Sequence, residues 1–223
     1  MSARGYFITG TDTDVGKTYV ACWLLRQLNR QGLRCLGMKP VAAGVSNTAA
    51  GQDNVDVVAL AAAGYRPVPR DWINPYLLSL PVSPHIAAAR EQVQIDFARI
   101  EFAYRQLADN ADVVLVEGAG GWRAPLTDSQ DIADLAQQLQ LPVILVVGMR
   151  LGCLNHALLT VQAIYESGMQ LAGWIANQID PQMSEYAANL QTLCQRLPAP
   201  LLAELPYAKN PDLLSDLSLQ RWF

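Results

Sequence analysis

Short apolar runs of strand length alternate with helical patterns along most of this 223-residue chain. Strands that are apolar along their whole length are typical of a parallel sheet, because helices cover both of its faces. The alternation therefore predicts an α/β fold with a doubly wound, mostly parallel sheet and helices on both faces, formed by one domain over residues 1–223. The expected strands are 6–9, 34–38, 113–116, 143–147, 171–176 and 201–205, and the expected helices are 16–32, 132–139, 157–167 and 185–197.

Two segments, 40–53 and 65–84, interrupt this alternation and are rich in Gly, Pro, Asn and Ser. We expect both to form long excursions from the sheet. Long loops in a compact domain are usually functional or mobile. In doubly wound folds such loops lie beside the carboxyl ends of the strands, which is where ligands bind.

The charge balance is acidic, with a net charge of -4 and a pI of about 5.1. This argues against bulk nucleic-acid binding, which needs a basic face. The longest apolar run, 141–149, is too short to span a bilayer, which takes ~20 residues. No basic-then-apolar leader is expected at the N-terminus, and the scattered Cys22, Cys35, Cys153 and Cys194 fit reduced thiols. We therefore expect a cytoplasmic protein that binds neither nucleic acid nor membrane.

A glycine-containing loop, GTDTDVGKT, follows the first expected strand and opens a helix at residues 10–18. Backbone N–H groups and the helix dipole would surround a phosphate there. Lys17 would reach the outer phosphates and the Thr18 hydroxyl would complete a Mg²⁺ shell. Five residues separate Gly10 from Gly16, where the common phosphate loop has four. We call residues 10–18 the phosphate loop.

Three further residues are candidates for the same site. The apolar strand 113–116 ends in the acid Glu117, which could hold Mg²⁺ near the phosphate loop. Lys39 follows the second strand and could face the γ-phosphate, although a single lysine at this position also fits a solvated loop. Asp56 lies in a stretch that leads from loop to helix, where an acid is more often a helix cap or a first-turn residue than a metal ligand.

Taken together, these residues resemble the dethiobiotin synthetase family of ATP-dependent P-loop NTPases. The resemblance covers nearly the whole chain, and its two most specific motifs are GTDTDVGKT and VEGAGGW. The other segments that carry it are GMKPVAAG, VDVVAL, NPY, SPH, LPVILVVG, LGCLNHA, LAGWIAN and PAPLLAELPY.

The resemblance implies an ATP- and Mg²⁺-dependent ring closure. One amine of 7,8-diaminopelargonic acid takes up CO₂ as a carbamate, and ATP phosphorylates the carbamate. The second amine then expels phosphate and closes the cyclic urea of dethiobiotin. Such an enzyme needs an aligned γ-phosphate and neutralised charge, and no covalent protein intermediate.

The resemblance also implies roles for individual residues. Lys39 and Lys17 correspond to the catalytic lysines, and Thr18, Asp56 and Glu117 to the Mg²⁺ ligands. The nucleotide-binding positions are Thr13, Asp14, Val15, Gly16, Lys17, Thr18, Asp56, Glu117, Gly118, Ala119, Gly120, Asn177, Leu205, Pro206, Tyr207 and Asn210.

The family is a homodimer in which the substrate chain crosses the subunit interface, and its carboxylate meets a helix N-terminus. Two departures concern this part of the site: Ala43 replaces a family serine, and Asp14 stands where Glu is expected. The substrate-binding positions implied are Thr11, Ala43, Gly121, Gly152, Cys153, Leu154, Asn155 and Tyr186.

Two other functions fit the same fold. One is a dimeric P-loop ATP switch that acts on a protein partner, as the partitioning ATPases do. Such switches usually carry an additional lysine early in the phosphate loop, where this chain has Thr11 to Asp14, and often end in a basic amphipathic tail. The other is a glutamine-dependent ligase of the cobalamin pathway, for which we find no glutaminase domain or nucleophile motif.

Overall fold

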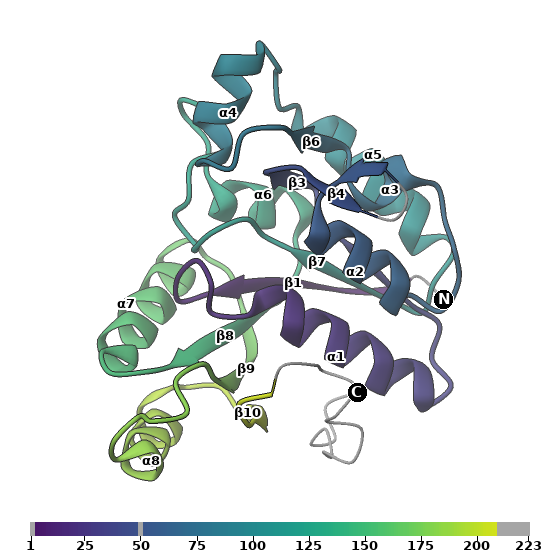
Figure 1. Cartoon of the computed structure of the whole chain (residues 1–223). Coiled ribbons are helices and arrows are strands. Elements are labelled where there is room, and N and C mark those ends of the chain that lie inside the picture. Colours follow the sequence, from purple (N-terminus) through teal and green to yellow (C-terminus); the bar gives the residue numbers. More distant parts are fainter. Residues whose placement is uncertain (1–2, 49–50, 209–223) are drawn as a thin grey trace.

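The computed structural model describes residues 3–48 and 51–208, and its centre is a six-stranded sheet in the order β10-β9-β8-β1-β7-β2 (Figure 1). Every neighbouring pair in this sheet is parallel. The predicted doubly wound parallel sheet is therefore confirmed, and all six expected strands belong to it. They are β1 (Arg4–Gly10), β2 (Cys35–Met38), β7 (Val113–Glu117), β8 (Val143–Met149), β9 (Leu171–Gln178) and β10 (Leu201–Leu205).

Helices cover both faces of the sheet, as Figure 1 shows. Along β8, Val143, Leu145 and Val147 belong to one buried cluster, whereas Ile144 and Val146 belong to the other. The first cluster includes residues of α5, α6 and α7, and the second includes residues of α1 and α2. The helices are α1 (Lys17–Arg30), α2 (Val55–Ala63), α3 (Arg70–Ile73), α4 (Pro84–Glu91), α5 (Phe97–Ala108), α6 (Ile132–Leu139), α7 (Cys153–Glu166) and α8 (Tyr186–Arg196).

The four expected helices correspond to α1, α6, α7 and α8. α7 begins at Cys153 rather than at residue 157, because Cys153 continues the buried stripe of Ala157, Val161 and Ile164. Within the described part of the chain, no helix combines the length and apolar character needed to cross a membrane.

The two expected excursions leave the central sheet, but the prediction that they are loops was wrong in part. β3 (Val41–Ala43) pairs in parallel with β6 (Tyr76–Leu78), and β4 (Ser46–Thr48) pairs antiparallel with β5 (Gly51–Asp53). Each of these strands has three residues, too few for a hydrophobic period to be read. The pairing satisfies backbone groups that would otherwise be left without partners.

Two strands anchor the phosphate loop from behind. Val15 is 1% exposed, and a Cβ built on Gly148 of β8 would lie 2.8 Å from Val15 Cγ1 and 2.9 Å from Val15 Cβ. Asn177 Nδ2, at the end of β9, donates to the Val15 carbonyl at 2.9 Å. Gly16 follows with φ of 86°, in the left-handed region that favours glycine, and α1 begins at the next residue. The loop is thus held by packing as well as by hydrogen bonds.

Gly148→Ala is expected to lower the free energy of unfolding by about 1–3 kcal/mol, because its Cβ would overlap a valine that cannot retreat without moving the loop backbone. Urea unfolding followed by circular dichroism measures this loss. In a double-mutant cycle, Gly148→Ala should cost less in a Val15→Ala background, where the Val15 methyl groups are absent. Equal costs in both backgrounds would show that the contact does not anchor the loop.

Candidate active site

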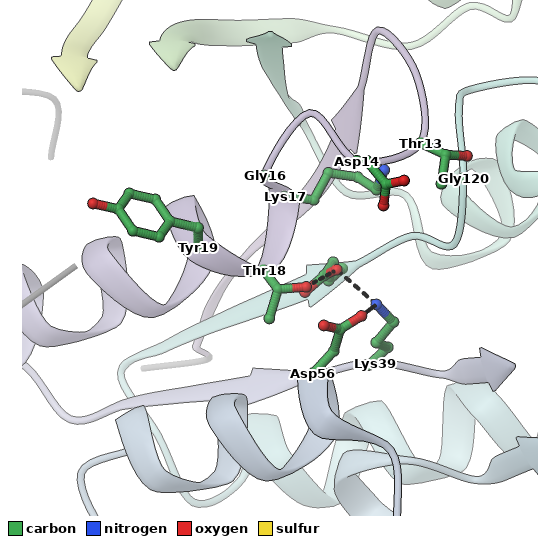
Figure 2. Close-up of a pocket in the computed structure, with 10 residues that line it drawn as sticks. Thr13, Asp14, Gly16, Lys17, Thr18, Tyr19, Lys39, Asp56 and Gly120 are labelled. Carbon is green, nitrogen blue, oxygen red and sulfur yellow. Dashed lines mark hydrogen bonds and ion pairs between the residues drawn. The ribbon is translucent and has the colours of Figure 1, made fainter. Parts of the chain in front are cut away.

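A cavity of about 370 Å³ opens where β1, β2 and β7 end, and Figure 2 shows the side chains around it. Because the three strands are parallel neighbours in the sheet, the residues that follow them meet at one edge. We call this the loop cavity. It is lined by Thr13, Asp14, Gly16, Lys17, Thr18, Tyr19, Lys39, Asp56, Glu117 and Gly120.

Lys17, the second residue after the loop valine, is a buried cation at the start of α1. Its Nζ donates to the carbonyl of Asp12 at 2.9 Å, so the side chain folds back along the phosphate loop. Burial lowers the pKa of Lys17, and the negative charge of Glu117 opposes this shift. The arrangement places a positive charge and the first N–H groups of a helix around one point, as an anion site requires.

Lys39 is held between two carboxylates. Its Nζ lies 2.8 Å from Glu117 Oε1 and 2.5 Å from Asp56 Oδ2. Burial by itself would lower the pKa of Lys39, but the charges and hydrogen bonds of Glu117 and Asp56 outweigh it, and the pKa is raised. The lysine is therefore an ammonium ion in a buried ion-pair network, and the solvated loop position that its sequence context also allowed is excluded.

Thr18 completes this group, which we call the Glu117 cluster: Thr18, Lys39, Asp56 and Glu117. The Thr18 hydroxyl donates to Glu117 Oε1 at 2.7 Å. In Figure 2, the side chains of Thr18, Lys39 and Asp56 point toward one another. Glu117 joins them, since its Oε1 accepts from both the Thr18 hydroxyl and Lys39 Nζ, and Lys39 Nζ also donates to Asp56 Oδ2. The three residues that the sequence proposed as metal ligands therefore lie together.

The cluster has donor atoms that suit Mg²⁺. Glu117 is 1% exposed, and its second oxygen, Oε2, is buried without a hydrogen-bond partner. Mg²⁺ typically takes one or two carboxylates and completes its shell with phosphate oxygens and water. Among the described residues, no group of three or more His, Cys, Asp or Glu side chains could hold a metal by itself. The two carboxylates and the threonine of the cluster fit a metal that is shared with phosphates.

A second cavity, of about 630 Å³, adjoins the first. Ala43, from β3, is part of its wall, and we call it the Ala43 cavity. Five residues line both cavities: Thr13, Asp14, Lys39, Asp56 and Gly120. The remaining lining residues of the Ala43 cavity are Ala43, Pro81, Val82, Ser83, Pro84, Ala119, Gly121 and Ala124.

Several predicted site residues lie outside both cavities. A Cβ on Gly118 would meet Phe7 and Ile132 at 3.0 and 3.1 Å, so this glycine packs against the core. The Thr11 hydroxyl accepts from the N–H of Gly148 at 3.4 Å, which ties the loop to β8. The others that line neither cavity are Val15, Gly152, Cys153, Leu154, Asn155, Asn177, Tyr186, Leu205, Pro206 and Tyr207. Asn210 lies outside the described residues.

Gly152 to Asn155 form the N-terminus of α7, close to Tyr186 at the start of α8. The two helices contact each other, and burial and the charge of Glu204 raise the pKa of Tyr186. Leu151, directly before this turn, is 90% exposed. The structure therefore groups the predicted carboxylate-binding residues with one another, but not with the loop cavity of the same chain.

Some lining residues were not predicted. Tyr19 lines the loop cavity, and residues 81–84 line the Ala43 cavity. The SPH motif was a signal for the second group, since Ser83 and Pro84 belong to it. Arg150 also was not predicted, and its guanidinium lies 2.7 Å from Asp12 Oδ2. No spacing in the sequence indicates that pair, because 138 positions separate the two residues.

Known proteins with similar sequences identify the family of this chain. A family model described as an AAA domain matches residues 4–213. The ATP-dependent dethiobiotin synthetase BioD of Aromatoleum aromaticum is 55% identical over 209 residues, covering 94% of this chain and 93% of that protein. The enzyme of the same name from Cellvibrio japonicus is 50% identical over 206 residues, covering 92% of this chain and 90% of that protein.

Among solved structures, a ParA family ATPase from Chlorobium tepidum is similar to this chain with a TM-score of 0.58. The similarity covers 92% of this chain and 85% of the other at 13% sequence identity, so it shows the fold alone. By its sequence similarity to the curated relatives, the chain belongs to the ATP-dependent dethiobiotin synthetase family.

Proposed function

We propose that this protein uses ATP to carboxylate 7,8-diaminopelargonic acid and close it to dethiobiotin, a step of biotin biosynthesis. The observation that carries the proposal is the meeting of the two cavities at Lys39, which lines both. A phosphoryl transfer needs its attacking and leaving oxygens roughly in line through phosphorus, with positive charge beside the transferring group. The loop cavity would take the triphosphate of ATP, and the Ala43 cavity would take the diamine.

The reaction has three steps. An amine nitrogen forms a bond to the carbon of CO₂ and loses a proton, which leaves a carbamate. A carbamate oxygen then attacks the γ-phosphorus, the bond from that phosphorus to the β,γ-bridging oxygen breaks, and ADP leaves. Finally the second amine attacks the carbamate carbon and loses a proton, and the bond from that carbon to the phosphorylated oxygen breaks, so that phosphate departs and the urea ring closes.

The chain's own groups orient these reactants and neutralise their charge. Thr13 to Thr18 would enclose the β- and γ-phosphates with backbone N–H groups, and Lys17 would turn from the Asp12 carbonyl toward them. Lys39 would contact the γ-phosphate and the carbamate oxygen, whose charge changes during transfer. Ala119 to Gly121 bring backbone close to both reactants, since Gly120 lines both cavities.

Mg²⁺ would be held by Thr18, Asp56 and Glu117. The unpartnered Glu117 Oε2 is the atom of this structure that best supports a metal at the cluster. The ion would supply a double positive charge that stabilises the negative charge of the phosphates during transfer.

Beyond the two cavities, the proposal follows the family. Asn177, Leu205, Pro206, Tyr207 and Asn210 would bind the adenosine. The N-terminus of α7 and Tyr186 would receive the substrate carboxylate across the interface of a homodimer, which agrees with their distance from the loop cavity and with the exposed Leu151. We further propose that residues 1–223 form one domain, act in the cytoplasm and bind neither nucleic acid nor membrane.

Incubation of the purified protein with ATP, Mg²⁺, bicarbonate and 7,8-diaminopelargonic acid tests the proposal. Mass spectrometry should detect dethiobiotin and ADP, both of which depend on the diamine. If the folded protein binds ATP but forms no dethiobiotin, and hydrolyses ATP only with a protein partner, it is an ATP switch instead.

Lys39→Ala is expected to lower kcat for dethiobiotin formation by about 10²–10³-fold, because the transferring charge loses its closest cation. Quantitative mass spectrometry of the product under saturating substrates measures this change. Arg105→Ala removes an exposed cation on α5 and serves as the control with unchanged kcat. A threefold change in kcat corresponds to about 0.7 kcal/mol, which we take as the limit of significance. If kcat of Lys39→Ala stays within threefold of wild type, Lys39 does not stabilise the transfer step.

Ala43→Ser restores the serine of the family pattern in the wall of the Ala43 cavity. A new hydrogen bond to the diamine or carbamate is worth about 0.5–1.5 kcal/mol, so KM for the diamine should fall roughly 2- to 12-fold. The matched control is Ala42→Ser, since Ala42 is fully buried in a separate cluster with Val57 and Ile73. That control should destabilise the protein without lowering KM; an unchanged KM in Ala43→Ser would show that residue 43 does not contact the substrate.

A further inference from the structure

The Glu117 cluster already contains a cation. The Lys39 ammonium lies between Glu117 Oε1 and Asp56 Oδ2, and these are the two carboxylates proposed to hold Mg²⁺. The Lys39 side chain is 8% exposed and the Glu117 side chain is 1% exposed. The ion pair is therefore shielded from water and substantially stronger than a pair on the protein surface.

Glu117 needs a cation whether or not a nucleotide is bound. An ionised carboxylate that is buried without a partner is strongly unfavourable, because it has lost the water that would solvate its charge. Thr18 donates one neutral hydrogen bond, which does not cancel the charge. Lys39 is the group that neutralises Glu117 in the structure described here, and Asp56 holds the same ammonium from the other side.

This position conflicts with the proposed role of Lys39 in transfer. An ammonium that bonds to both carboxylates has its charge committed to them, and Mg²⁺ on the same carboxylates would repel it. We propose that Lys39 is the resident cation of the metal site, and that Mg²⁺ displaces it and thereby releases it toward the reactants. The proposal rests on the proposed function for the destination of the lysine, but not for the exchange of cations.

The surroundings of Lys39 allow this exchange. Asp56 is 37% exposed and is reached from the cavities, so an incoming ion has an open side. Lys39 also lines the Ala43 cavity, which gives the displaced ammonium a place among polar groups and water. Its flexible four-carbon stem permits the movement without a change in the backbone. The catalytic lysine can therefore reach the reactants only after the metal has bound.

Lys17 provides a matched control. It is also a buried lysine in the loop cavity, and its charge interacts with Glu117 and Asp56. Its Nζ bonds to the carbonyl of Asp12, however, and no ion pair joins it to either carboxylate. Removing Lys17 therefore changes the general potential of the site, whereas removing Lys39 also vacates the proposed position of the metal.

The test measures binding of Mn²⁺, as a probe for Mg²⁺, to nucleotide-free wild type, Lys39→Met and Lys17→Met by electron paramagnetic resonance. We expect Lys39→Met to bind at least about tenfold more tightly than wild type, and Lys17→Met to differ from wild type by less than about threefold, because only the first vacates the site. Equal affinities in the two variants, weaker binding in Lys39→Met, or no binding to any of the proteins would overturn the proposal.

A second measurement needs no variant and decides the matter if Lys39→Met does not fold. Wild-type protein is treated with a lysine-acylating reagent at increasing Mg²⁺, with and without ADP, and modification of Lys39 is measured by peptide mass spectrometry. Release predicts that modification of Lys39 rises severalfold with Mg²⁺. Unchanged or reduced modification under both conditions contradicts it.

Neither measurement uses the diamine, so the two proposals can fail separately. Dethiobiotin formation without cation exchange would refute this inference alone, and cation exchange without dethiobiotin formation would refute the proposed function alone.

Discussion

A carboxylate buried at the end of a central strand sets the conditions for the whole site. Glu117 is the last residue of β7, which lies between β1 and β2 in the sheet. Burying this charge is unfavourable unless cations and donors surround it. The two neighbouring strands supply them, because β1 leads into the loop that carries Thr18 and β2 leads into Lys39. The parallel register, with Met38 beside Val116 and Ile8 beside Glu117, brings these groups to one edge.

Lys39 and Lys17 interact with this carboxylate in different ways. Lys39 forms an ion pair with it, and the pair outweighs the effect of burial on its pKa. Lys17 turns to a backbone carbonyl, and burial dominates its pKa. A hydrogen bond from an ammonium to a neutral carbonyl is weaker than a buried ion pair, so Lys17 is the more easily recruited by an incoming phosphate. Lys39 can be recruited by a phosphate only after a competing cation has bound to its two carboxylates.

The sequence predicted the central sheet well because all six strands are long enough or apolar enough to show their burial. It did not predict β3, β4, β5 or β6, because each of these strands has only three residues and shows no hydrophobic period. No helix was expected at α5, although Asp96 caps it and Phe97, Ile100, Ala103 and Leu107 form its buried stripe. Lys39 and Asp56 were each ambiguous alone, because only the folded chain brings residues 17 positions apart within 2.5 Å. The role of each residue can be recognised only from their ion pair, and reasoning about one residue at a time does not predict that pair.

The walls of the two cavities have separate structural origins. Most groups around the loop cavity belong to the phosphate loop and to the starts of α1 and α2, and Lys39 and Glu117 lie at the ends of β2 and β7. Ala43 and residues 81–84 belong to segments outside the six-stranded sheet. Mutations in these segments can therefore reshape the acceptor wall while the phosphate chemistry stays intact. The fold thus separates the phosphate-binding part of the site, built on the central sheet and its first helices, from a recognition wall built on added segments, so that a change of acceptor need not require a new fold.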